Sequence, residues 1–187
     1  MVAGVALMPL LVEPDVRFHA SFLRAMEGFA AEGRGGAADT SMIGRDLREW
    51  GGRWHDPAVF ADYVAEVRGL SRPETPRPAA LVPATTLWWT EGDEFLGRIQ
   101  LRHRLNAFLA DVGGHVGYDV PPEHRRKGHA TAMLRSLLPL AAQGFGLDRV
   151  LVTCDHDNVG SRKVIEACGG IFEDRRGVKL RYWVPTF

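Results

Sequence analysis

The stretch that most constrains this chain runs from Gly114 to Thr131, GHVGYDVPPEHRRKGHAT. Its first part has the β-branched and aromatic content of a strand, with Val116, Tyr118 and Val120 on one face at period two. Pro121 and Pro122 end that strand, because neither can donate a ladder hydrogen bond. A long apolar helix begins near Gly128, so the sequence predicts a strand that leads through a basic turn into a helix.

Such a turn favours an anion site. The first N–H groups of a helix have no internal partner, and the positive end of the helix dipole lies at the same place. Gly128 and Ala130 keep side chains away from that backbone. Arg125, Arg126 and Lys127 add positive charge, so a phosphorylated or pyrophosphorylated ligand could bind here. A solvated basic turn is the alternative.

Two familiar phosphate loops do not fit this stretch. The loop of nucleotide triphosphatases needs Gly-Lys followed by Ser or Thr, whereas this chain has Lys127-Gly128 and then His129. The dinucleotide fingerprint Gly-x-Gly-x-x-Gly is also absent from the turn. A phosphate-binding hydrolase or kinase is one hypothesis for such a turn. The chain lacks the phosphate-loop lysine and the set of metal-binding carboxylates that this hypothesis requires.

The turn resembles the acyl-coenzyme A (acyl-CoA) loop of the GNAT superfamily of N-acetyltransferases. That loop reads Arg/Gln-x-x-Gly-x-Gly/Ala and usually follows Val-x-Pro. The residues that fall in register are Val120, Pro122, Arg125, Gly128 and Ala130. A second, independent match follows a short apolar strand near 148–153, where Asn158 begins a helix that stops at Gly169-Gly170. The two matches span residues 114–173, about a third of the chain.

The resemblance implies an α/β fold with a mixed, mostly antiparallel central sheet of about six to seven strands and helices on both faces. It implies one domain over residues 1–187, with an acyl-CoA core at about 85–187. Helices within about 15–70 would form part of the acceptor site. In that fold the strand before the loop and the strand before Asn158 splay apart.

Periodicity and turn residues predict the remaining elements. The expected strands are Val5–Val12 at a sheet edge, Thr85–Thr90, Phe95–Leu105, and a final pair, 170–174 and 178–184, around Arg175-Arg176-Gly177. The expected helices are 16–32, 42–50, one from Pro57 and one from Gly128 to about Gln143. The apolar face of the first helix is Phe18, Phe22, Met26, Phe29 and Ala30.

Composition excludes several partners. Twenty-three basic and 23 acidic residues leave no net charge, which gives no reason to expect nucleic acid or an anionic membrane. Two cysteines make no disulfide framework, and the chain has no zinc-type His/Cys spacing. It also has no secretory leader and no apolar run long enough to cross a bilayer. These observations predict a reduced cytoplasmic protein without a metal.

The resemblance implies an acetyl-CoA-dependent N-acyltransferase. It would move an acetyl group from acetyl-CoA to a primary amine of a small molecule or peptide, by direct attack in a ternary complex. The pyrophosphate would bind at Arg125, Arg126, Lys127, Gly128, His129, Ala130 and Thr131, and the N–H of Val120 would polarise the thioester carbonyl. Asn158 would contact the pantetheine arm or a bound water, and Ser161, one turn inside that helix, is a further predicted cosubstrate ligand. A homodimer through a sheet edge is plausible, but the sequence does not indicate one.

The chain departs from the family pattern at the proton donor. Many members have tyrosine seven residues after the asparagine, and this chain has Ile165 there. Water, Tyr118 or a group near Cys154 are the alternatives. The missing tyrosine also motivates a second hypothesis, a catalytically inactive acyl-CoA-binding sensor or regulatory module.

For the general base we predict His115 first and His103 second. A hairpin that turns near Leu109 would place them opposite each other, as two imidazoles that titrate near neutrality. The alternative for each is a strand histidine that bonds its neighbour's backbone. The predicted walls of the acceptor site are Trp50, Trp54, His55 and Trp88, although large aromatic residues usually belong to a core.

Overall fold

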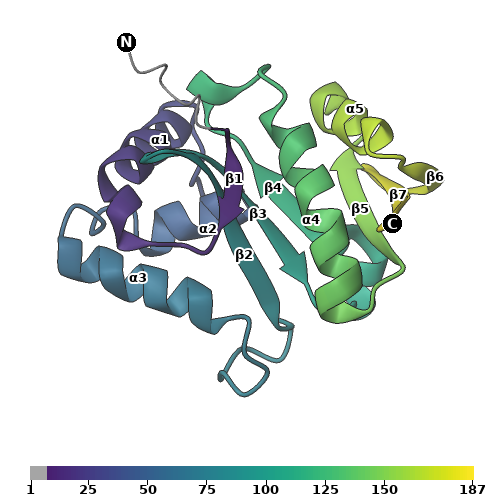
Figure 1. Cartoon of the computed structure of the whole chain (residues 1–187), viewed down its shortest axis with the longest axis horizontal. Coiled ribbons are helices and arrows are strands. Elements are labelled where there is room, and N and C mark those ends of the chain that lie inside the picture. The colour runs from purple at the N-terminus through teal and green to yellow at the C-terminus, as the bar shows by residue number, and fades with distance from the viewer. Residues whose placement is uncertain (1–7) are drawn as a thin grey trace, which may run out of the picture.

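The computed structural model describes residues 8–187, which form one seven-stranded sheet with helices on both faces (Figure 1). The strands are β1 (Leu10–Val12), β2 (Ala84–Glu91), β3 (Glu94–Arg102), β4 (Val116–Asp119), β5 (Arg149–Asp155), β6 (Ile171–Arg176) and β7 (Lys179–Pro185). The helices are α1 (His19–Ala31), α2 (Met42–Glu49), α3 (Pro57–Gly69), α4 (His129–Phe145) and α5 (Val159–Ala167).

The strand order is β1-β2-β3-β4-β5-β7-β6. Every neighbouring pair is antiparallel except β4 and β5, so the predicted mixed, mostly antiparallel sheet is confirmed. The parallel pair shares a single register position, Val116 with Val152. The two strands therefore part immediately beyond it, at their carboxyl ends, where β4 leads into the loop before α4.

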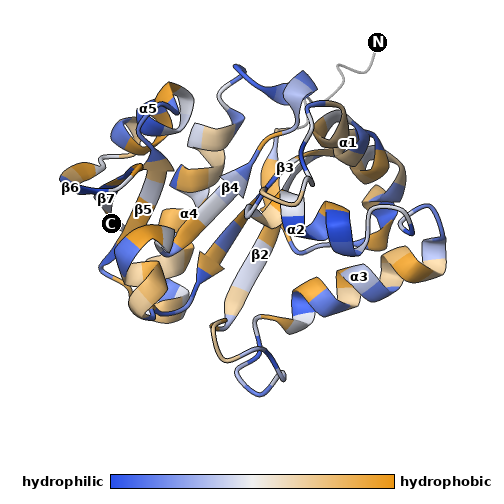
Figure 2. Ribbon diagram, turned by 180° about the vertical axis from the view of Figure 1, so that it is seen from behind, coloured by the Kyte–Doolittle hydropathy of each residue, from blue (hydrophilic) through white to orange (hydrophobic). Residues whose placement is uncertain are grey.

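Each face of the sheet has its own core. On one face α4 and α5 pack on β3, β4 and β5, through side chains that include Ile99, Leu134 and Ile165. On the other face α1 and α3 enclose an aromatic cluster that includes Phe22, Phe60, Trp54 and Trp88. Figures 1 and 2 show α4 and α2 on opposite sides of β4, and Figure 2 shows α2 as largely hydrophilic. The predicted helices on both faces are thus confirmed.

Three helix ends carry capping residues, and the predicted cap at Asn158 is among them. The side chain of Asp56 caps α3 by accepting the N–H of Ala58, with Pro57 at the first helical position. The side chain of Asn158 caps α5 by accepting the N–H of Ser161 at 3.0 Å. Gly146 ends α4 with a left-handed φ of 63°, a conformation that glycine adopts without strain.

Some expected boundaries change. The edge position of β1 is confirmed at Leu10–Val12, while residues 5–7 of that predicted strand lie outside the described residues. The first helix begins later, at His19, after a 3-10 turn, and on its apolar face Ala25 is buried whereas Ala30 is exposed. Arg175 and Arg176 belong to β6, and the turn to β7 lies at residues 177–178.

Candidate active site between the splayed strands

The loop between β4 and α4 has the geometry expected of an anion site. Gly128 is the N-cap of α4 with a φ of 84°, a left-handed conformation that costs other residues strain. Arg126 also has a positive φ, 64°, which is uncommon for a residue with a side chain. The N–H groups of the first turn, from His129, have no acceptor inside the helix and face the space before it.

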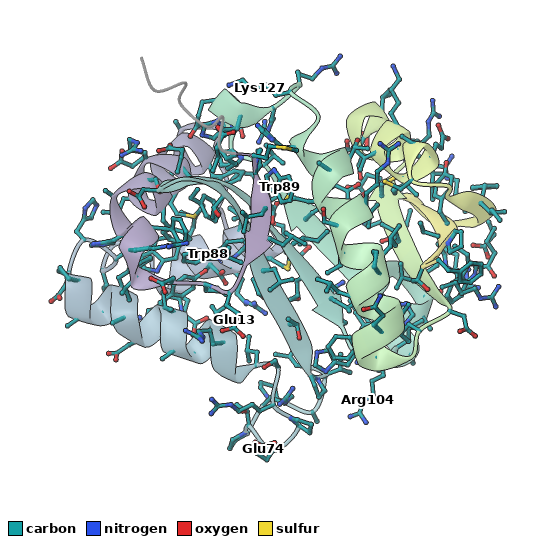
Figure 3. All side chains as sticks on the ribbon, viewed as in Figure 1. Glu13, Glu74, Trp88, Trp89, Arg104 and Lys127 are labelled. Atoms are coloured by element: carbon teal, nitrogen blue, oxygen red, sulfur yellow. The ribbon has the colours of Figure 1, made fainter. Side chains whose placement is uncertain are left out.

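The basic side chains of this loop have different roles. Arg125 forms two hydrogen bonds with the carboxylate of Glu32, at 2.6 and 2.8 Å, and donates to the carbonyl of Val120 at 2.9 Å. This pairing ties the loop to the end of α1 and neutralises one charge. Lys127 donates to the carbonyl of Glu123 at 2.9 Å, and Figure 3 shows it at the outer end of the molecule.

A cavity of about 840 Å³, which we call the loop cavity, opens in front of this turn. Residues predicted to hold the cosubstrate line it, namely Val120, Arg125, Arg126, Gly128, His129, Ala130, Thr131, Asn158 and Ser161. Lys127 is the predicted residue that does not contribute to the lining. His129 is held in place, because its Nδ1 accepts the indole N–H of Trp89 at 3.2 Å.

A second cavity, of about 720 Å³, lies over the polar face of β3 and β4, and we call it the strand cavity. Its floor includes Gln100 and Arg102, which alternate with the buried Leu101 of β3. Helix α2 and the segment before it form the opposite wall. The two cavities share five lining residues: Arg34, Tyr118, Asp119, Asn158 and Ser161. They therefore meet where β4 and β5 part.

Two hydroxyl groups lie at this meeting point. The phenol oxygen of Tyr118 is 2.7 Å from Oγ of Ser161, and the phenol also donates to the carbonyl of Ser161 at 3.3 Å. Burial raises the pKa of the Tyr118 phenol well above its usual range, so the phenol stays protonated at neutral pH. Tyr118, predicted as a proton donor, and Ser161, predicted as a cosubstrate ligand, are thus brought together.

A carboxylate that the sequence analysis missed also borders both cavities. Burial raises the pKa of the Asp119 carboxyl, against the opposing effect of Arg98 and Arg34. These two guanidinium groups lie 3.6 and 3.8 Å from its oxygens. The sequence did contain one signal for Asp119, because it is a charged residue beside Tyr118 at the end of the central strand. For Arg34 the sequence gives no signal, because it comes from the loop after α1.

Arg98 and Asp46 form a buried pair beneath the strand cavity. Nη1 of Arg98 donates to Asp46 Oδ2 at 2.6 Å and to the hydroxyl of Tyr63 at 3.2 Å. Arg98 is only 3% exposed and Asp46 only 5%. The pair joins α2 and α3 to the centre of the sheet, and Arg98 in turn lies beside Asp119. It fixes the wall of the strand cavity relative to its floor.

The structure does not bring the two predicted histidines together. Leu101 pairs with Val116, so Arg102, not His103, lies opposite His115. The prediction that the histidines oppose each other is therefore wrong. His103 bonds the hydroxyl of Thr85 at 2.8 Å and packs against the ring of Phe145 at a tilt of 35°. Neither histidine lines either cavity, so this arrangement does not support the hypothesis of a histidine base.

His115 has a structural contact instead. Its Nδ1 accepts the N–H of Leu151 at 2.9 Å, which is the backbone bond named as the alternative for a strand histidine. Burial, with a contribution from Arg102, lowers the pKa of His115 from 6.5 to about 4. The imidazole of His115 is thus neutral in the folded protein at neutral pH.

This neutral imidazole predicts a dependence of stability on pH. Between pH 6.5 and 4 the unfolded chain binds a proton at His115 that the folded chain does not, so acidification favours unfolding. From pH 7 to 4 the native protein should lose about 3 kcal/mol more unfolding free energy than His115→Gln, whose amide oxygen can still accept the Leu151 N–H. Urea titrations across this range measure both. Parallel losses in the two proteins would contradict the prediction.

The predicted aromatic walls of the acceptor site are wrong. Trp54 and Trp88 are 1% and 0% exposed inside the aromatic core, and Trp50 packs against that core. Neither these three residues nor His55 lines the loop cavity or the strand cavity. These large side chains instead pack in and against the core between α1, α3 and β2, where Figure 3 shows Trp88.

Two kinds of feature are absent from the part of the chain that the structure describes. No group of three or more His, Cys, Asp or Glu side chains within residues 8–187 is arranged to hold a metal ion. None of the helices in the same range has the length and apolar character to cross a bilayer.

Comparison with known proteins now connects this geometry to a family. The sequence model described as "Acetyltransferase (GNAT) domain" matches residues 38–171. One curated relative, the "Uncharacterized N-acetyltransferase YjdG" of Bacillus subtilis (strain 168), is 29% identical over 69 residues. That match covers 37% of this chain and 40% of the relative, so well under two thirds of the relative's length is matched.

Solved structures share the fold over nearly the whole chain. RimJ of Mycobacterium smegmatis, in complex with CoA-disulfide, has a TM-score of 0.66 at 17% identity, with 96% of this chain and 83% of that chain covered. The ribosomal-protein-S5-alanine acetyltransferase of Vibrio fischeri has a TM-score of 0.65 at 13% identity, with 98% and 95% covered. The microcin C7 self-immunity acetyltransferase MccE, in complex with acetyl-CoA and AMP, has a TM-score of 0.64 at 12% identity, with 95% and 92% covered. Because the family model spans most of the sequence, this chain belongs to the GNAT acetyltransferase family.

Proposed function

We propose that the protein transfers an acetyl group from acetyl-CoA to a primary amine in a ternary complex. The observation that carries this proposal is the meeting of the loop cavity and the strand cavity at Tyr118, Asp119 and Ser161. One cavity has a helix N-terminus suited to a pyrophosphate, and the other is open to an acceptor. Two substrates entering from the two cavities would meet beside groups that can move protons.

In this proposal acetyl-CoA lies in the loop cavity. Its pyrophosphate would bind the backbone from Gly128 to Thr131, with Arg126 beside it. The pantetheine arm would pass Asn158 between the diverging strands, and the N–H of Val120 would polarise the thioester carbonyl. The names of similar solved proteins support this placement, because RimJ and MccE were solved with CoA-disulfide and acetyl-CoA.

The amine would attack from the strand cavity. Its nitrogen forms a bond to the carbonyl carbon while the bond from that carbon to sulfur breaks. Asp119 would take the proton that the nitrogen loses, because its raised pKa makes it a better base than an ordinary carboxylate. Tyr118, hydrogen-bonded to Ser161, would donate a proton to the leaving sulfur.

The acceptor would be a small molecule or a peptide with a free amine. Met42 and Arg45 of α2 line the strand cavity, which supports a role for the N-terminal helices in the acceptor site. Peptide acceptors are supported by the names of similar structures, which include a ribosomal L7/L12 α-N-protein acetyltransferase and a ribosomal-protein-S5-alanine acetyltransferase.

Calorimetric titration of the full chain with acetyl-CoA, followed by thiol release in the presence of a panel of amines, tests the proposal. Saturable binding and amine-dependent release of CoA thiol are expected. If neither acetyl-CoA nor CoA binds, the proposal fails.

A second candidate, an acyl-CoA-binding module without catalysis, is favoured by one observation. Ile165, which stands where many relatives have a tyrosine, is fully buried in the core and has no group that can donate a proton. Binding of acetyl-CoA without thiol release for any amine would select this candidate.

Removal of one hydroxyl tests the proton donor. We expect Tyr118→Phe to lower kcat by about 100-fold with little change in the KM for acetyl-CoA, because the phenol acts on the leaving sulfur. Tyr182→Phe is the matched control, since its hydroxyl bonds Glu166 at 3.3 Å and lines neither cavity. Equal kcat values in the two variants would refute the assignment.

A further inference from the structure

The strand cavity has more positive charge than its carboxylates neutralise. Its basic lining residues are Arg34, Arg45, Arg77, Arg102 and Lys179, and its acidic ones are Asp39, Asp119 and Asp155. Two of the basic groups have close partners, because Arg34 bonds Asp39 at 2.9 Å and Lys179 bonds Asp155 at 2.8 Å. The guanidinium groups of Arg45, Arg77 and Arg102 have no ion pair with any of these three carboxylates among the described residues.

Arg102 lies on the cavity floor without a carboxylate. Its Nη1 donates to the carbonyls of Gly113 and Gly114 at 3.0 and 3.1 Å, which fixes the direction of the side chain. Within residues 8–187 no acidic oxygen approaches it within ion-pair distance. Its Nη2 lies 3.6 Å from the place that a Cβ on Gly117 would occupy. The thioether of Met42 takes up that place, with its Cε 3.0 Å away, and Met42, Gly117 and Arg102 all line the cavity.

Arg45 and Arg77 add charge to the same cavity. The nearest carboxylate to Arg45 is Asp46 at 3.5 Å, but Asp46 is already held by Arg98 at 2.6 Å. Arg77 donates to the backbone carbonyls of Leu70, Arg72 and Thr75, which carry no charge. Burial lowers the pKa of Arg102, and the nearby Arg45 lowers it further, so these like charges act on each other.

We infer that the acceptor is an amine with an anionic oxygen group, carboxylate or phosphate, and that Arg102 binds this group in the strand cavity. The inference rests on the proposed function and adds the class of its acceptor. A guanidinium offers a planar fork that matches both anions, and an anion would relieve the repulsion between Arg102 and Arg45. Acetyl-CoA is not the source of that anion, because none of these three arginines lines the loop cavity.

The test compares acceptors that differ in one charge. With the full chain and acetyl-CoA, thiol release is measured for amino acids and dipeptides against their C-terminal amides, and for phosphoethanolamine against ethanolamine. We expect kcat/KM to be about 10-fold to 100-fold higher for the charged member of the preferred pair. The two series show whether carboxylate or phosphate is the group recognised.

Arg102→Gln should reduce this ratio to near 1 by raising the KM for the charged acceptor, with an unchanged Kd for acetyl-CoA. Arg104→Gln is the matched control, because Arg104 is exposed and lies outside both cavities, at the end of the molecule opposite Lys127 (Figure 3). If Arg102→Gln does not fold, Arg45→Gln provides the second variant, since the Arg45 side chain is 45% exposed. It should lower the ratio in the same direction.

Three results would overturn the inference while acetyl-CoA binding stands. These are equal kcat/KM values within every pair, an unchanged ratio in a folded Arg102→Gln, or no turnover of any charged amine. Failure of the native protein to bind acetyl-CoA is a different result, because it refutes the proposed function itself.

Discussion

Replacing Gly128 with glutamate should abolish acetyl-CoA binding, the largest functional effect that we expect from a single substitution. Gly128 is the N-cap of α4 at a φ of 84°, so any side chain there is strained. Glutamate also places a negative charge where the helix N-terminus would receive a pyrophosphate. The Kd for acetyl-CoA, measured by calorimetry, should rise by at least about 100-fold.

The chain provides a control that separates charge from strain. Gly146 ends the same helix at a φ of 63° with open space around it, and it lies outside the loop cavity. Gly146→Glu should therefore cost about 1 kcal/mol of stability and leave the Kd unchanged. Gly128→Ala keeps the strain without the charge and should bind with an intermediate Kd. Native-like binding by a folded Gly128→Glu would refute the anion site.

Replacing Asp46 with alanine should destabilise the protein by about 3–5 kcal/mol, the largest stability effect that we expect. The substitution leaves the guanidinium of Arg98, which is 3% exposed, without its closest carboxylate. An uncompensated buried charge is far more costly than a lost surface pair. The midpoint of urea unfolding at neutral pH measures the loss.

Two further variants isolate the charge. Tyr63→Phe removes the two hydrogen bonds between the Tyr63 hydroxyl and this pair but no charge, and should cost about 1 kcal/mol. The double variant Asp46→Leu with Arg98→Met removes both charges, so it should cost less than the sum of the single losses. A loss below 1 kcal/mol for Asp46→Ala would show that Arg98 is neutralised by other means, for example by Asp119 at 3.6 Å.

The sequence determined the parts of the site that lie in consecutive residues. The β4-loop-α4 unit could be read from two prolines and Gly128, and the start of α5 from the side chain of Asn158. Caps, breakers and left-handed glycines act on residues a few positions away, so their effect is written in the local sequence. Family resemblance added the mixed, mostly antiparallel sheet with helices on both faces, which local signals do not specify.

The tertiary structure alone decided which strand residues face one another. The predicted turn near Leu109 contains a short π-helix, Leu109–Gly113, and the pairing of β3 with β4 differs by one residue from that expected. Since side chains alternate between faces, one residue is enough to separate His103 from His115.

Packing between distant segments brings together the rest of the site. Arg34, Arg102, Asp119 and Ser161 come from four segments, and they border common cavities only because the sheet and its two helical layers place them there. The sequence specified the strand, the loop and the helix that form the loop cavity, because these depend on neighbouring residues. It could not specify the strand cavity, because the charges that line it are brought together by packing between distant elements.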